Sequence, residues 1–213
     1  MNQYKNSKNN VRRIAMTGMM IAISILMTYT PFGTVRLVAV EATIAHLPTI
    51  ILAIVEGPVC GLIAGTAMGI VSMIYSITMP ATALSPFIAN PLVSILPRIF
   101  IGLFSYYAYV GLSKAMKGTK AGQIISVAVG SAVGSITNTV GVLGMLYVVY
   151  AKDLFQALIE FGMAQETDAL AQTVMAFLVG IASVQGVVEM LVIAFLGTLV
   201  VLALKRAGYG RKF

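Results

Sequence analysis

The sequence predicts an all-α integral membrane protein with six transmembrane helices and both termini in the cytoplasm. Hydrophobic residues make up 59% of its 213 residues and charged residues only 10%, a composition typical of membrane proteins. Long apolar stretches alternate with short polar or Pro- and Gly-containing segments. Eleven of the 14 Lys and Arg residues lie in three segments: four before residue 14, three between residues 113 and 121, and four after residue 204. An even number of spans places these segments on one side, which the positive-inside rule assigns to the cytoplasm.

Six apolar stretches define one membrane domain that covers residues 1–213. They fall at about residues 11–29, 44–55, 59–78, 91–112, 123–150 and 173–204. A helix rises about 1.5 Å per residue and needs roughly 20 residues to cross the hydrocarbon core. The second stretch is short and is interrupted by Pro48, and it leads into the third through Glu56-Gly-Pro.

The first and third predicted spans carry small residues at regular spacing. Gly18 and Ala22 lie four positions apart in the first span, so they share a face that another helix can approach closely. That spacing is compatible with packing inside the protein's own bundle and with contact to a partner. A glycine at every fourth position of the third span predicts a smooth face, which forms either a static seam or a sliding surface. These glycines are Gly57, Gly61, Gly65 and Gly69.

The fourth predicted span begins with a capping sequence. Asn90 is a favourable N-cap, and Pro91 fits the first helical position, where its missing N–H costs nothing. Arg98 follows two turns later with no other charge near it in sequence, and Pro97 can loosen the helix just before it. Because a guanidinium is costly in lipid, we expect Arg98 to face the bundle interior or a wet cavity and to bind an anion. The alternatives are a pair with an internal carboxylate and snorkelling to the outer interface.

Polar residues inside the fifth and sixth predicted spans are further candidates for ligand contact. Asn138 lies between Thr137 and Thr139 near the middle of the fifth span. Gln185 and Glu189 share a face deep in the sixth span, because they are four residues apart. In lipid such groups need partners, either on another helix or on a ligand, and Glu189 must be protonated, paired or wetted.

Two outer loops complete the candidate site. The loop after the first span gathers Arg36, Glu41 and His46, the only histidine. Either these residues form a salt bridge within the loop while His46 caps a helix, or the loop is a lid that contacts the ligand. The loop after the fifth span has the apolar spacing of a short amphipathic helix, which we expect to cross the mouth of the cavity. The candidate ligand-contacting residues are Arg98, Asn90, Asn138, Thr137, Gln185, Glu189 and His46.

Several function classes lack their motifs in this sequence. It contains no G-x-x-x-x-G-K-[ST] phosphate loop and no His/Cys spacing typical of a metal site. The only candidate catalytic pair, His46 with Glu41, is supported by no motif. We therefore expect neither enzymatic activity nor a bound metal or cofactor. The formal net charge of +7 is read as membrane topology and not as nucleic-acid binding.

Several of these motifs together resemble one family. The stretch Asn90-Pro-Leu-Val-Ser-Ile-Leu-Pro-Arg98 resembles the substrate-binding S components of energy-coupling-factor (ECF) vitamin transporters. The similarity extends through Ile44-Ala-His-Leu-Pro-Thr-Ile-Ile, the Glu56-Gly-Pro turn and the glycine-spaced third span, and so covers nearly the whole chain. The stretch Thr137-Asn-Thr-Val-Gly-Val-Leu-Gly144 looks most like the pantothenate branch.

The resemblance implies a fold, a location and a set of partners. S components have six helices, bind one vitamin near the outer face of the bacterial plasma membrane, and have no ATPase activity of their own. They dock to a transmembrane coupling protein of the EcfT type, which carries two cytoplasmic ATPases. Small residues on the first span contact the coupling protein in that family, and the matching positions here are Gly18 and Ala22. In that family the two positions are both alanine, whereas here they are glycine and alanine.

The chemistry of pantothenate fits this reading of the residues. Its carboxylate suits Arg98, and its hydroxyls and amide suit Asn90, Asn138 and Gln185. A flat pyridoxine-type, riboflavin or folate ligand is the alternative, since Tyr106 and Tyr147 offer rings for stacking. A stand-alone proton-coupled carrier that uses Glu189 as a relay is the other alternative.

Overall fold

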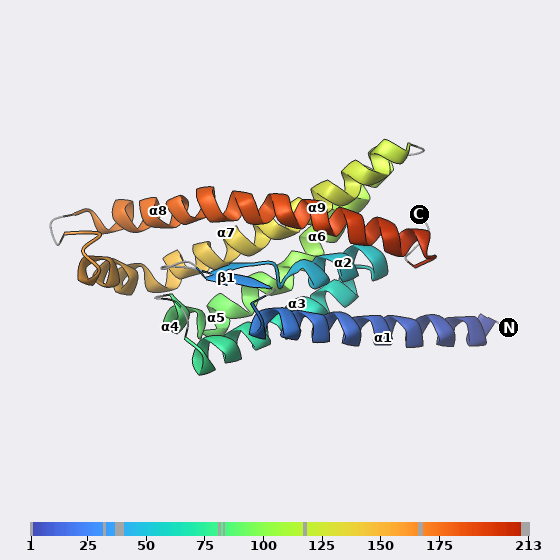
Figure 1. Ribbon diagram of the computed structural model, residues 1–213, viewed down its shortest axis with the longest axis horizontal. Coiled ribbons are helices and arrows are strands. Elements are labelled where there is room, and N and C mark those ends of the chain that lie inside the picture. Colours follow the sequence, from blue (N-terminus) through green and yellow to red (C-terminus); the bar gives the residue numbers. More distant parts are fainter. Residues whose placement is uncertain are drawn as a thin grey trace.

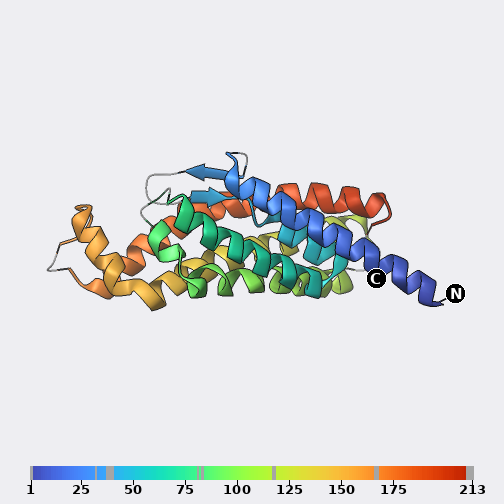
Figure 2. The same cartoon turned by 90° about the horizontal axis from the view of Figure 1, so that it is seen from below.

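The computed structural model is a bundle of helices that run roughly along one long axis (Figure 1), and it describes residues 2–31, 33–36, 41–80, 82, 84–116, 119–165 and 168–209. Its elements are α1 (Asn2–Tyr29), β1 (Thr34–Arg36), β2 (Glu41–Thr43), α2 (Leu47–Glu56), α3 (Pro58–Thr78), α4 (Ser85–Ile88), α5 (Pro91–Ser94), α6 (Leu96–Ala115), α7 (Lys120–Glu160), α8 (Leu170–Ile181), the π-helical turn η1 (Ala182–Gly186) and α9 (Val187–Arg206). The strands β1 and β2 form a small antiparallel hairpin. The described ends of the chain lie at the same end of the bundle in both views (Figures 1 and 2).

Within the described residues, five helical segments are long and apolar enough to cross a membrane. These segments are Asn10–Tyr29, Pro58–Thr78, Pro91–Ala115, Lys120–Glu160 and Leu170–Arg206. These five segments contain the first, third, fourth, fifth and sixth predicted spans.

The second predicted span differs from the other five. Its helix, α2, has only 10 residues, all of them buried, and at about 1.5 Å per residue it reaches about half of the hydrocarbon thickness. It packs against α1, α3, α6, α7 and α9. Because all of its residues are buried and it packs against five other helices, α2 is the central core helix of the bundle.

The glycine face of α3 packs closely against α5 and α6. A Cβ added to Gly61 would lie 3.1 Å from Cα of Gly102, and one added to Gly69 would lie 2.7 Å from Cα of Ile95. At Gly65, a Cβ would collide with the carbonyl oxygen of Arg98. Three of the four predicted glycines therefore form a closely packed seam, which sets the position of the helix that carries Arg98.

The fourth glycine, Gly57, has a different role. It ends α2 and begins α3 with φ at 105°, a conformation that side chains other than glycine rarely adopt. Its sequence spacing matches the seam, but its backbone forms the turn.

The start of the fourth predicted span follows the expected local rules. The side chain of Asn90 caps α5 by accepting a hydrogen bond from the amide of Leu92 at 2.9 Å. The helix is then interrupted at Ile95, and α6 begins two residues before Arg98. Pro97 lacks an amide and its ring crowds the carbonyl four residues earlier, which explains a break at this place.

The last two long segments are also irregular. α7 has non-helical backbone angles at Tyr150 (φ −127°, ψ 22°), which is where the fifth predicted span ends. The part of α7 beyond Tyr150 bends away at the end of the bundle opposite the termini (Figure 2) and buries Leu154 and Leu158 in an apolar cluster with α8. The π-helical turn Ala182–Gly186 interrupts the final segment, and such turns are frequent at functional sites.

Candidate functional site

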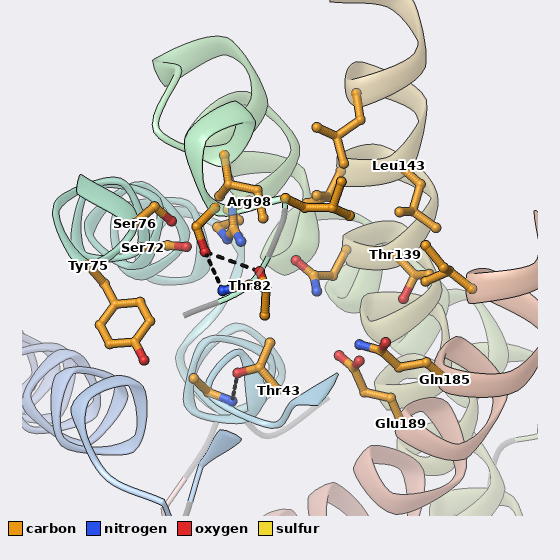
Figure 3. A pocket seen from close by; sticks show the side chains of 18 of the residues that line it. Thr43, Ser72, Tyr75, Ser76, Thr82, Arg98, Thr139, Leu143, Gln185 and Glu189 are labelled. Atoms are coloured by element: carbon orange, nitrogen blue, oxygen red, sulfur yellow. Dashed lines mark hydrogen bonds between the residues drawn. The ribbon is translucent and has the colours of Figure 1, made fainter. Parts of the chain in front are cut away.

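The described residues enclose a cavity in the part of the bundle that holds α4, α5 and the hairpin (Figures 1 and 3). Its empty volume is about 930 Å³, including the open space at its mouth. One part of the lining is apolar, from Met68, Leu84, Ile88, Val142, Leu143, Leu146 and Ile181. Another part carries polar groups, from Thr28, Thr43, Ser72, Tyr75, Ser76, Thr82, Ser85, Arg98, Asn138, Thr139, Gln185 and Glu189. An apolar pocket with a few convergent polar groups is the usual form of a small-molecule site.

Arg98 lines this cavity from α6 and is only 5% exposed. Its Nη1 donates to the carbonyl oxygen of Ser94 at 2.6 Å and contacts the Ser94 hydroxyl at 3.4 Å. That hydroxyl in turn donates to the carbonyl oxygen of Gly69 at 3.2 Å, across the glycine seam. The Nε of Arg98 is buried without a hydrogen-bond partner, and no carboxylate lies within ion-pair distance in the described part of the chain. The guanidinium is thus hydrogen-bonded to backbone and serine oxygens, and it interacts electrostatically with Glu189 without forming an ion pair with it.

Glu189 lines the cavity from the first turn of α9 and is 6% exposed. Its Oε1 lies 3.3 Å from Nδ1 of His46. The backbone of Thr43 and the side chain of Asn138 also lie against this carboxylate. Glu189 therefore brings together α9, α7 and the segment between β2 and α2.

His46 is fully buried directly before α2. It is outside the described lining of the cavity and lies behind Glu189. Its backbone is at the N-cap position of α2, but its side chain makes no capping hydrogen bond. Its ring is directed toward α9 instead. The side chains of Arg36 and Glu41, which the sequence grouped with His46, are outside the described residues.

Asn138 and Gln185 also line the cavity, as Figure 3 shows for Gln185 beside Glu189. Asn138 is 6% exposed, and its Oδ1 has no hydrogen-bond partner among the residues described. Gln185 lies in the π-helical turn. Four of the seven sequence candidates, Arg98, Asn138, Gln185 and Glu189, thus come together around one cavity.

Asn90 and Thr137 are placed elsewhere. Asn90 uses its Oδ1 to cap α5, and its Nδ2 donates to the hydroxyl of Tyr150 at 2.9 Å. The hydroxyl of Thr137 donates to the carbonyl oxygen of Val133 within α7 at 2.7 Å. Both residues are absent from the described cavity lining, and Thr139 lines it in place of Thr137. The side chains of Asn90 and Thr137 thus form hydrogen bonds within the protein itself.

Several hydroxyl groups at the cavity were not predicted. Ser72 and Ser76 line it from α3 (Figure 3) and lie four residues apart, so their spacing after the glycine face was a usable signal. Thr82 comes from the loop before α4 and Ser85 is the first residue of α4; their hydroxyl oxygens are 3.1 Å apart. Loop side chains of this kind have no periodic pattern that would place them in a cavity.

Gly18 and Ala22 lie far from these groups on α1. Both are on the exposed face of the helix, and a Cβ added to Gly18 would meet no atom within 4 Å. The described residues of the bundle do not cover this face.

Comparison with known proteins assigns the chain to a family. No curated protein matches the chain. Residues 12–201 match the family described as "ECF transporter, substrate-specific component". That stretch includes the cavity, the glycine seam and most of α1 and α9. The chain therefore belongs to the ECF transporter substrate-specific components, membrane-embedded subunits that bind a vitamin for transport and associate with a transmembrane coupling protein and ATPases.

Proposed function

We propose that this S component binds pantothenate, with the vitamin's carboxylate on Arg98. The observation that carries the proposal is the buried Arg98 guanidinium, which has no carboxylate partner in the described part of the chain. A buried charge without an ion-pair partner is costly in a membrane protein. A ligand carboxylate would compensate it, with a planar geometry that guanidinium recognises.

The rest of the cavity also favours a flexible, hydroxylated acid. Pantothenate has one carboxylate, two hydroxyls and an amide, and the polar lining supplies Asn138, Gln185 and Glu189 as partners. Flat ring vitamins favour aromatic stacking. Tyr106 and Tyr147, the expected stacking residues, are absent from the described lining, where Tyr75 is the aromatic residue.

For the membrane, we propose six elements with both termini in the cytoplasm of a bacterial cell and the cavity facing outward. The six elements are α1, α2, α3, α5 with α6, α7, and α8 with α9. The shared end of the described termini supports this orientation (Figure 1), and the cavity lies toward the other end. The Lys and Arg distribution assigns the terminal end to the cytoplasm.

For the partner, we propose that Gly18 and Ala22 contact a coupling protein of the EcfT type, which acts with two ATPases. The exposed position of both residues supports a contact outside the protein's own bundle. Small side chains let a partner helix approach closely.

The test is to identify the ligand by mass spectrometry after purification from vitamin-rich medium. Calorimetric titration then compares pantothenate with its alcohol analogue, which lacks the carboxylate. We expect pantothenate in the purified protein, tighter binding of the acid, and no ATP hydrolysis by the isolated chain. A different vitamin, or equal binding of acid and alcohol, would contradict the proposal. Uptake by the isolated chain driven by a pH gradient alone would favour the carrier alternative.

A further inference from the structure

The cavity holds a basic and an acidic side chain on different helices. Arg98 enters it from α6, and Glu189 enters it from α9 (Figure 3). No ion pair joins these two side chains, both of which are described. A ligand carboxylate on Arg98 leaves Glu189 free to contact another part of the ligand. The site therefore has a second recognition element besides its arginine.

Glu189 is suited to accept hydrogen bonds from a ligand. Its side chain lines the cavity and is only 6% exposed. His46, Thr43 and Asn138 already lie against its carboxyl group. The two oxygens of a carboxyl group have up to about four lone-pair sites, so these three neighbours leave capacity for a further donor. The group it fits is a hydrogen-bond donor such as a hydroxyl.

The surroundings of Glu189 hold its carboxylate in one place. His46 lies behind it, with Nδ1 3.3 Å from Oε1, and this histidine is fully buried. Thr43 and Asn138 flank it. His46 is outside the described lining of the cavity, so it acts on the ligand only through Glu189.

We propose that Glu189 is a specificity-determining residue that selects ligands with hydroxyl groups opposite their carboxylate, and that His46 is its positioning residue. This inference rests on the proposed function, because it takes the carboxylate of the ligand to be on Arg98. The substrate class is then a monocarboxylic acid whose far end carries hydroxyl donors. Pantothenate belongs to this class.

Two analogues separate the two recognition elements. One is the alcohol form of pantothenate, which lacks the carboxylate. The other is pantothenate with both hydroxyls replaced by hydrogen. Calorimetry on the full chain in detergent gives the acid preference from the first analogue and the hydroxyl preference from the second.

Variants of Glu189 and Arg98 should each lose a different one of the two preferences. A hydrogen bond to a charged group corresponds to roughly a 10- to 100-fold affinity difference, which is the hydroxyl preference expected of the wild type. Glu189→Met should reduce this preference to below about threefold and keep the acid preference, because the methionine is similar in size but cannot accept a strong hydrogen bond. Arg98→Ala should lose the acid preference and keep the hydroxyl preference. The matched control is Glu160→Met at an exposed acid of α7, which should change neither.

Two further variants keep the inference testable if Glu189→Met does not fold. Glu189→Gln keeps the size and one acceptor oxygen, and it should lower the hydroxyl preference by about three- to tenfold. His46→Phe keeps a ring at that position but removes the nitrogen. It should lower the hydroxyl preference and leave the acid preference unchanged, whereas a purely structural role would weaken both.

The outcomes distinguish this inference from the proposed function. If the wild type does not bind pantothenate, the proposed function fails and the inference fails with it. If the wild type binds pantothenate and the Glu189 variants keep the full hydroxyl preference, only the inference is overturned. Loss of the acid preference together with the hydroxyl preference in the Glu189 and His46 variants would also overturn it.

Discussion

The two ends of the bundle differ in whether their buried ionisable side chains form ion pairs with arginine. At the terminal end, Glu56 is 1% exposed and is paired twice, with Arg12 Nη2 3.1 Å from Oε1 and Arg13 Nε 3.7 Å from Oε2. Arg13 also contacts the thiol of Cys60 at 3.4 Å. At the cavity, Arg98 and Glu189 are buried to a similar degree without pairing with each other.

We infer from this difference that the Glu56 pairs are structural, whereas we propose that Arg98 and Glu189 bind the ligand. The Glu56 pairs join α1 to the junction of α2 and α3, and they need no further molecule. Their contribution is reduced because Arg12 and Arg13 are 36% and 30% exposed and stay partly hydrated. We expect the buried Arg98 and Glu189 to lower the stability of the empty protein, and a ligand that binds both in the folded state to raise it.

The largest effect is expected at the unpaired cation. Arg98→Ala should weaken pantothenate binding by about 2–5 kcal/mol, as for the loss of one partner from a buried charged pair. Arg98→Lys keeps the charge but loses the planar fork, so it should weaken binding less. The alanine variant should still fold, because it removes a desolvation cost. Calorimetric titration with pantothenate and its alcohol measures both effects. An alanine variant that still prefers the acid as strongly as the wild type would show that another group reads the carboxylate.

The next effect tests whether the glycine seam positions that cation. Gly65→Ala should destabilise the protein by about 1–3 kcal/mol, because the added methyl collides with the carbonyl oxygen of Arg98. The control is Gly111→Ala in α6, where an added Cβ would meet no atom within 4 Å. It should be neutral or stabilising through helix propensity. Thermal unfolding in detergent compares the two. Equal melting temperatures would mean that the seam adapts to a methyl group without cost.

A smaller effect is expected at the paired end. Glu56→Gln should lower the free energy of unfolding by about 1–2 kcal/mol, below the full value for charge-assisted bonds because the arginines are partly exposed. Pantothenate affinity should be unchanged, since the pairs are remote from the cavity. The thiol of Cys60, now 6% exposed, should react faster as α1 loosens. Glu160→Gln is the exposed control. Weaker ligand binding in Glu56→Gln would show that the two ends are coupled.

The smallest effect on the isolated protein is expected on the outer face of α1. Gly18→Leu and Ala22→Leu should change stability by less than about 0.5 kcal/mol and leave pantothenate affinity unchanged. Uptake by cells that contain the coupling protein and ATPases should fall, because bulky side chains block close helix approach. Met19→Leu, at a residue of α1 that is 61% exposed, is the control. Loss of binding together with uptake would assign the two residues to the internal bundle.

Local sequence rules account for much of the fold. The Asn90 cap and the helix break near Pro97 follow from neighbouring residues. The second predicted span, at about residues 44–55, corresponds to the 10-residue helix α2. Apolar composition does not distinguish a short core helix from a membrane-crossing one. The same rules assigned Gly57 to the seam because its spacing fits. In the structure its backbone forms the turn between α2 and α3 instead.

The sequence by itself determined which residues carry charge inside an apolar chain and which stretches form helices, because hydrophobic length and caps are local properties. Only the tertiary structure decided how those charges are matched. Glu56 pairs with Arg12 and Arg13, Glu189 lies against His46, and Arg98 has no carboxylate within ion-pair distance in the described residues. Asn90 is likewise bonded to Tyr150, a residue 60 positions away. Such pairings depend on the rotation and spacing of packed helices, which the interhelical contacts determine and no local pattern encodes.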